Sequence, residues 1–156
     1  MSTSITDVRV RRPQQHEALL NELREEGIFP TFRDALLFAA AVGYHFSRSA
    51  KFTSAAGDPI RYETLTGPTF AEALINMIAA CISDGDPEIM DQTRLEERVG
   101  LFEAFANGGL EYIQEQVNVR HQPAELVVVA LVIEVLAGSG GAEPVSVDEL
   151  LSGVNW

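Results

Sequence analysis

The amino-acid sequence predicts a mainly α protein, a compact single-domain bundle of about five to six short helices with at most one small hairpin. Apolar residues recur at spacings of three and four along much of the chain, which is the periodicity of helices with one buried face. Residues typical of helix starts precede most of these stretches. The chain has 156 residues, of which 46% are hydrophobic and 22% are charged, and this balance suits one globular domain with a substantial core.

The N-terminal part divides into a basic arm and a first helix. Residues 1–12 contain three arginines and are expected to form a flexible basic arm. Pro13 suits the first turn of a helix, because its missing N–H would have no helical partner there. Gly27 suits the end of that helix, since glycine readily adopts the left-handed conformation that helix ends require.

A second helix is predicted from Thr31 to about Val42, with Gly43 in the left-handed turn that follows it. The Thr31 hydroxyl can accept a hydrogen bond from the backbone N–H of Asp34. The stretch 35–42, ALLFAAAV, has no polar face that could reach base edges, so this helix packs rather than reads DNA. We expect these residues to form the core or a self-association seam: Leu36, Leu37, Phe38, Ala40 and Ala41.

The segment that follows the second helix is predicted to be irregular. Residues 47–59 are small and polar, which predicts a long loop. In residues 60–65, IRYETL, apolar and polar residues alternate imperfectly, which predicts either a short strand or merely extended chain.

Two further helices are expected to begin at capping boxes, in which the first and fourth residues cap each other's backbone N–H groups. Thr69 with Glu72 forms one such pattern, and Thr93 with Glu96 forms the other. Glycine is costly inside a helix, so residues 107–109, Asn-Gly-Gly, are expected to bend or interrupt the second of these helices.

The last large apolar segment leaves helix and strand open. Valine and isoleucine in residues 124–136 favour strand, whereas the length, Pro123 before the segment and Glu125 in its first turn favour a buried helix. Helix is the better interpretation. The helical domain would then span residues 13–137, and residues 138–156 would form a Gly-rich link and a docked C-terminal short helix.

The charge of the chain is strongly uneven. The net charge is −12, with +1 in residues 1–62 and −13 in residues 63–156. The acidic part would repel DNA phosphates, so only the N-terminal part could approach them. The longest apolar runs are far shorter than the roughly 20 residues that cross a membrane, so no membrane association is expected. The single cysteine, Cys81, cannot form an internal disulfide, which is typical of a cytoplasmic protein.

No pattern of catalytic or metal-binding residues stands out. The three histidines, His16, His45 and His121, have no ligand spacing to one another or to Cys81. Cys81 lies at an apolar helical position, which predicts a buried and inert thiol. No phosphate-binding loop is present. We therefore expect no catalytic residue, no metal and no cofactor, and a protein that is not an enzyme.

Basic residues of the N-terminal half are the candidates for DNA contact. An arm with arginines and a basic loop could contact phosphates, but the same side chains could instead pair with nearby carboxylates. The candidates are Arg9, Arg11, Arg12, Arg33, Arg48, Lys51 and Arg61.

Several segments together resemble a known family. They are RRPQQHEALLNEL, then FPTFRDALLFAAAVG, then DPIRYETL, an acidic DPEI turn and RVGLFEAFANGGLEYIQEQV. In this order they resemble the DNA phosphorothioation (Dnd) system-associated protein 4 family, over roughly residues 9–118. The resemblance implies a small bacterial protein encoded with phosphorothioate-modification and restriction genes that defend against foreign DNA. It supplies no catalytic residues to carry over.

The resemblance and the charge pattern together suggest three functions. The preferred one is a non-enzymatic accessory or adaptor subunit that joins a larger protein of a DNA modification or restriction complex, with self-association through the alanine-rich helix. One alternative is a direct DNA-binding regulator that uses the basic N-terminal half. The other is an acidic DNA mimic that inhibits a nuclease through residues 84–115.

Overall fold

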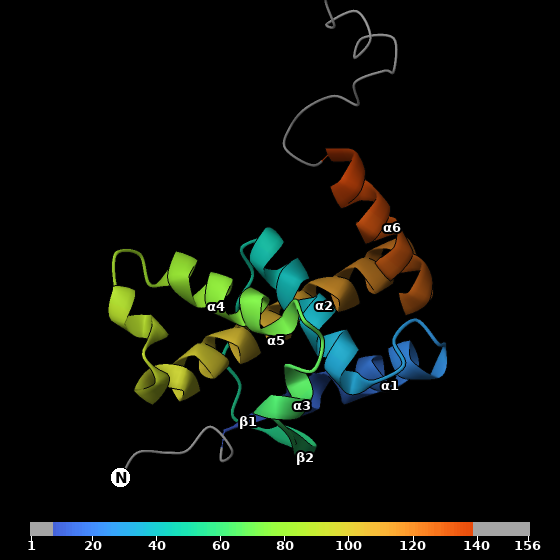
Figure 1. The fold of residues 1–156 in the computed structure, drawn as a ribbon. Helices are drawn as coiled ribbons and strands as arrows, with labels where there is room; N and C mark the ends of the chain where they lie inside the picture. Colours follow the sequence, from blue (N-terminus) through green and yellow to red (C-terminus); the bar gives the residue numbers. More distant parts are fainter. Residues whose placement is uncertain (1–7, 139–156) are drawn as a thin grey trace, which may run out of the picture.

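The computed structural model describes residues 8–138, and these form a mainly helical domain with one two-stranded hairpin (Figure 1). This confirms the predicted fold class. The elements in chain order are β1 (Arg9–Pro13), the 3-10 helix η2 (Gln14–His16), α1 (Glu17–Glu25), α2 (Phe32–His45), β2 (Ala55–Arg61), α3 (Tyr62–Leu65), α4 (Ala71–Ile82), the 3-10 helices η3 (Pro87–Met90) and η4 (Gln92–Arg94), α5 (Leu95–Arg120) and α6 (Ala124–Gly138).

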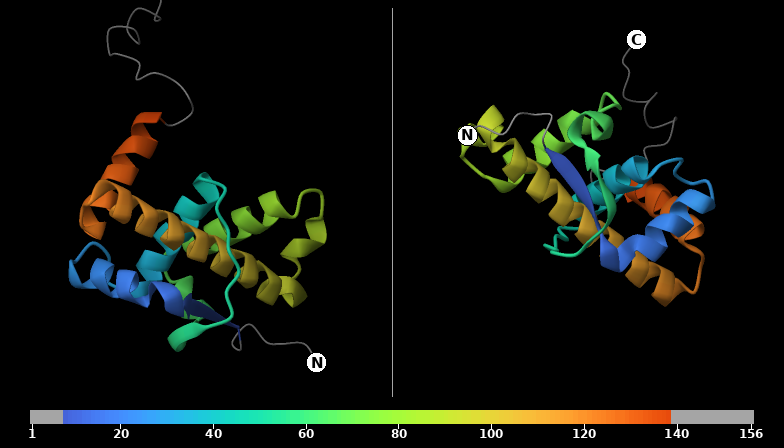
Figure 2. Two further views of the ribbon diagram at one scale, coloured as in Figure 1. Left: turned by 180° about the vertical axis from the view of Figure 1, so that it is seen from behind. Right: turned by 90° about the horizontal axis from the view of Figure 1, so that it is seen from below.

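The long helix α5 is the centre of the fold. Its residues 102–110 are all buried, which a helix achieves only when neighbours cover it on every side. Helix α2 crosses it, while α4, α6 and strand β1 pack around it. Figure 2 shows α5 running across the molecule, with α6 turned away from its C-terminal end.

Glycine at three positions allows α5 to lie close to α2 and to the segment that follows α2. A Cβ atom on Gly109 would collide with the carbonyl group of Ala39, and one on Gly43 would collide with the carbonyl oxygen of Phe105. A Cβ atom on Gly108 would collide with the Arg48 carbonyl. The two helix backbones therefore approach each other more closely than side chains would allow.

This close approach explains two wrong predictions. Gly43 does not end α2, because the helix continues to His45, and Ser47, with φ 55°, takes the left-handed conformation instead. Residues 107–109 do not bend α5, which is continuous to Arg120. In both places glycine serves packing between helices rather than a turn.

The predicted flexible arm is also wrong where the structure describes it. Residues 9–13 form β1, which pairs with β2 in an antiparallel register that places Arg9 opposite Arg61. Val10 is almost fully buried, so the strand is fixed to the core. The first helix accordingly starts later than Pro13, with η2 and then α1. Gly27, with φ +78°, follows that helix as predicted.

The loop and cap predictions had mixed outcomes. The Thr31 side chain accepts from the Asp34 N–H at 3.2 Å, which confirms that cap. Neither predicted capping box forms, since α4 and α5 begin without a side-chain cap, at Ala71 and Leu95. The predicted loop of residues 47–59 ends in β2, and residues 60–65 are divided between the end of that strand and the short helix α3.

Residues 124–138 form helix α6, which decides the question of helix or strand in favour of helix. Within residues 8–138 no single helix is long and apolar enough to cross a membrane. The Gly-rich link and docked short helix predicted for residues 138–156 lie outside the described residues, apart from Gly138, the last residue of α6.

The buried imidazole of His16 leads to a prediction about pH. Burial lowers the pKa of His16, and the nearby Glu111 carboxylate opposes that effect only in part. The unfolded chain takes up a proton near pH 6.5, whereas folded His16 resists it, so the free energy of unfolding should fall as the pH drops through and below this value. We expect His16→Gln to reduce this loss between pH 7.5 and 5.5 in urea titrations. The same substitution at the exposed His45 provides the control, and equal changes in the pH dependence for the two variants would contradict a role for the burial of His16.

Candidate functional site

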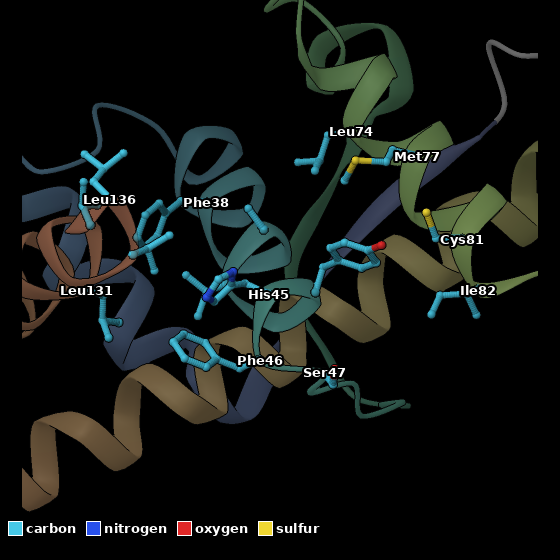
Figure 3. Close-up of a pocket in the computed structure, with 15 residues that line it drawn as sticks. Phe38, His45, Phe46, Ser47, Leu74, Met77, Cys81, Ile82, Leu131 and Leu136 are labelled. Atoms are coloured by element: carbon cyan, nitrogen blue, oxygen red, sulfur yellow. The ribbon is translucent and has the colours of Figure 1, made fainter. Parts of the chain in front are cut away.

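An apolar groove lies between three helices, with α2 as its floor and α4 and α6 as its walls (Figure 3). Its cavity volume is about 710 Å³, within the range of protein binding sites. Side chains that line the groove include Phe38, His45 and Phe46 from the region of α2, Leu74, Met77, Cys81 and Ile82 from α4, and Leu131, Val132, Val135 and Leu136 from α6.

The groove continues along α4 into a second hollow of about 670 Å³. The two hollows share Phe38, Ala41, Leu74 and Met77, so they form one surface feature. Phe70 lies in the second hollow and is 58% exposed, which is unusual for so large an apolar side chain. We call the two hollows together the α2–α4–α6 groove.

Helix α6 exposes more apolar surface than folding requires. It buries Val127, Val128 and Leu131 against the core, while Val132 and Leu136, which line the groove, are 40% and 72% exposed. Met77 on the opposite wall is 43% exposed. Contiguous apolar patches of this kind mark sites of protein interaction in soluble proteins.

The surroundings of the groove are acidic. Among the residues that line the two hollows, Asp34 is the only Asp, Glu, Lys or Arg. Residues 71–93, which contain α4, carry five Asp or Glu and no Lys or Arg. Residues 121–138, which contain α6, carry two Glu and again no Lys or Arg. Arg120 at the end of α5 pairs with Glu134 at 2.9 Å, so the excess negative charge lies mainly on the α4 side of the groove.

The polar groups that line the first hollow include the Tyr44 phenol, the His45 imidazole and the Cys81 thiol. The neighbouring Cys81 raises the pKa of the Tyr44 phenol. Cys81 is exposed, so the prediction of a buried thiol is wrong. The helical spacing of Cys81 was interpreted correctly, but its side of α4 faces the groove rather than the core.

The residues proposed for self-association or the core are divided by this groove. Leu36, Leu37 and Ala40 are buried in the core. Phe38 is half-buried and Ala41 is exposed, and both line the groove. The alanine-rich helix thus serves the core on one side and forms the floor of the groove on the other.

Most of the proposed DNA-contact residues are occupied by ion pairs. Arg11 pairs with Glu103 at 3.1 Å, Arg12 with Glu17 at 3.0 Å and Arg33 with Asp34 at 3.4 Å. Arg48 pairs with both Glu111 and Glu115. Within the described part of the chain, Arg9, Lys51 and Arg61 have no ion pair. The structure brings Arg9 and Arg61 together at one end of the hairpin and leaves the others spread over several elements.

Buried polar residues of α5 act as structural links, and two of them connect it to the N-terminal part of the chain. The Glu103 carboxylate accepts the backbone N–H and the guanidinium of Arg11, which fixes β1 to α5. The Asn107 amide accepts from Gln15 at 3.1 Å and donates to the Ala50 carbonyl at 2.8 Å. No group of His, Cys, Asp and Glu in residues 8–138 could hold a metal ion.

The segment from Phe102 to Ile113, FEAFANGGLEYI, thus carries most of the connections that define this fold. The family model for DNA sulphur modification system-associated protein 4 matches residues 9–145, which is most of the chain. The chain belongs to this family. No curated protein and no solved structure is significantly similar to it.

In this member of the DNA sulphur modification system-associated protein 4 family, the residues that carried the resemblance have structural roles. Gly109 admits α2, and Gly108 admits the Arg48–Ser49 segment that follows it. Glu103 and Asn107 connect β1, η2 and the 48–50 segment to α5. The sequence did not reveal the groove, because Leu74, Met77 and Cys81 have the spacing of core residues. The excess of apolar residues on α4 and α6 was the available indication.

Proposed function

We propose that this protein is a non-enzymatic accessory subunit of a bacterial DNA phosphorothioation-linked modification-restriction system. In this role it joins a larger protein of the system through the α2–α4–α6 groove. The family match supports the association with a DNA sulphur modification system. The groove supports the adaptor role, because it is an extended apolar surface with no evident role in folding.

The character of the partner follows from charge. The chain has a net charge of −12, and both groove walls lie in segments without Lys or Arg. A partner with a positive surface would therefore be attracted at long range and oriented on approach. A basic protein that itself handles DNA meets this requirement.

The interior polar residues support a role without catalysis. Glu103 and Asn107 are buried and already hydrogen-bonded to other parts of the fold. Arg98 is also buried and donates to the carbonyl oxygens of Ile89 and Asp91. Groups bonded in this way hold the helices together and are not free to bind a substrate.

Direct DNA binding is the weaker alternative. Phosphates would have to compete with the carboxylates that already pair with Arg11, Arg12, Arg33 and Arg48. Arg9 and Arg61 remain the best placed residues for DNA, so a gel shift with Arg9→Glu and Arg61→Glu variants tests this alternative. Salt-dependent binding that these variants abolish would favour the DNA-binding regulator.

The adaptor role predicts a specific loss of binding. Met77 lies in the groove and Met90 lies outside both hollows, and they are 43% and 38% exposed. A charge buried at an apolar interface is costly, so Met77→Glu should weaken binding to the partner by about 30-fold or more. The matched change Met90→Glu should alter it by less than about threefold. The measurement is calorimetric titration with each purified protein encoded beside this one.

Two results would contradict the proposal. One is that none of the purified system proteins binds the unmodified chain. The other is that Met77→Glu and Met90→Glu affect binding equally, which would move the interface away from the groove. The circular dichroism spectra of both variants should match the spectrum of the unmodified chain, since both side chains are on the surface.

A further inference from the structure

We infer that the segment held in the α2–α4–α6 groove is an amphipathic α-helix of the partner, with an apolar face bordered by Lys or Arg. This inference rests on the proposed function and specifies the chemistry of the partner. Three properties of the groove support it: the scarcity of hydrogen-bonding groups, the arrangement of the walls, and the sign of the surrounding charge.

The scarcity of hydrogen-bonding groups favours a helix. An extended segment would bring unpaired backbone N–H and C=O groups against an apolar surface, and each such group costs free energy. The surfaces around the groove come from helices, whose own backbone groups are already bonded, so no free strand edge is available to pair with it. A helix satisfies its own backbone groups and presents only side chains.

The arrangement of the walls also favours a helix. Helices α4 and α6 flank α2 on opposite sides, with Leu74 and Met77 on one wall and Leu131 and Leu136 on the other (Figure 3). Such a trough between helices accepts one apolar helix face through residues at i, i+3, i+4 and i+7. The second hollow extends the trough along α4 toward Phe70, which allows more than one turn to be in contact.

The charge of the surroundings sets the flanks of that helix. Asp84 and Glu88 are exposed just after α4, beyond Ile82 at the end of the groove, and have no ion pair within residues 8–138. Lys or Arg beside the apolar face of the bound helix would meet these carboxylates. Acidic flanks would instead be repelled.

The same charges argue against two other occupants. A second copy of this chain would bring its own acidic walls against those of the first. Residues 139–156 of the chain contain three Asp or Glu and no Lys or Arg, so they have the wrong charge as well. A basic helix from another protein fits best.

The single cysteine makes the test direct. Cys81 is the only thiol in the chain, is exposed and lines the groove, so an environment-sensitive dye attached there reports on the groove alone. The probes are designed 18-residue peptides with one fixed apolar face. One has lysine flanks, the second has glutamate flanks, and the third has lysine flanks with two central prolines that prevent a helix. Titration of unlabelled protein by calorimetry checks that the dye does not block the groove.

We expect the lysine-flanked helix to shift the dye emission to the blue and to bind about tenfold or more tightly than the glutamate-flanked helix at low salt. The proline-containing peptide should not bind. Met77→Glu should abolish the shift and Met90→Glu should preserve it. Equal binding of the two helical peptides would overturn the charge requirement, and binding of the proline peptide would overturn the helix.

Other occupants have distinct outcomes that would each overturn the inference. A blue shift that grows with protein concentration without peptide would identify a second copy of the chain. A red shift on changing Leu150 and Leu151 to Asp in the full chain would identify its own C-terminal segment.

The proposed function is tested separately from this inference. If a system protein binds in a Met77-dependent way while the helical peptides do not, the inference fails and the adaptor role stands. If the lysine-flanked helix binds while no system protein does, the adaptor role fails.

Discussion

Replacing Gly109 with alanine is expected to lower the free energy of unfolding by about 3–5 kcal/mol, although the change adds a single methyl group. The new Cβ atom would meet the carbonyl group of Ala39 and the backbone nitrogen of Gly43. These are backbone atoms of α2, so no side chain can rotate to make room. Helices α2 and α5 would have to separate, and the core between them would lose contacts.

The matched control lies in the same helix. Gly100 is exposed on α5, and a Cβ atom there would meet nothing within 4 Å. Alanine is the better helix former, so Gly100→Ala should raise the free energy of unfolding by about 0.5–1 kcal/mol. Urea titrations followed by circular dichroism measure both changes. Equal effects of the two substitutions would show that helix propensity, and not the crossing, determines the response.

The crossing also shows what the sequence could and could not predict. The mainly α class and the helix at residues 31–42 followed from periodicity and from the Thr31 cap, which are local properties. The role of Gly43, Gly108 and Gly109 could not be predicted in this way. A single sequence does not distinguish a glycine that ends a helix from one that allows a neighbouring backbone to approach. Only the three-dimensional contact distinguishes them.

Strand β1 was missed for a related reason. Residues 9–13, RVRRP, carry three arginines, and local composition gave no reason to expect a buried strand. Their position depends on partners far along the chain, namely β2 and the Glu103 carboxylate. Non-local pairing of this kind cannot be inferred from spacing within a short window.

The groove could not be predicted, because apolar residues on a helix can face either the core or a binding surface. Helix α6 is apolar on nearly all sides, which predicted a helix buried on all sides. The structure buries one side and leaves Val132 and Leu136 exposed along the groove. Periodicity identifies apolar faces but does not say whether the same chain or a partner covers them.

Replacing Glu103 with alanine should have the second largest effect on stability, about 2–4 kcal/mol. The Glu103 side chain is 7% exposed and accepts three hydrogen bonds from Arg11, including one from its backbone N–H at 2.6 Å. Alanine leaves that N–H without its partner and removes the connection between β1 and α5. The Arg11 side chain is 43% exposed, so water would satisfy its guanidinium, which limits the loss to the lower part of the range for buried pairs.

A comparison with Glu97 distinguishes the effect of burial on stability from the effect of ion pairing. Glu97 is on the same helix and pairs with Arg94 at 2.9 Å, but its side chain is 53% exposed. Glu97→Ala should therefore change the free energy of unfolding little, because water replaces the lost partner. The double variant Arg11→Ala with Glu103→Ala should still be destabilised, since the Arg11 backbone N–H remains without its acceptor. If that double variant recovered full stability, the loss in Glu103→Ala would come from the Arg11 guanidinium left without its partner, and the bond from the backbone would be of no consequence.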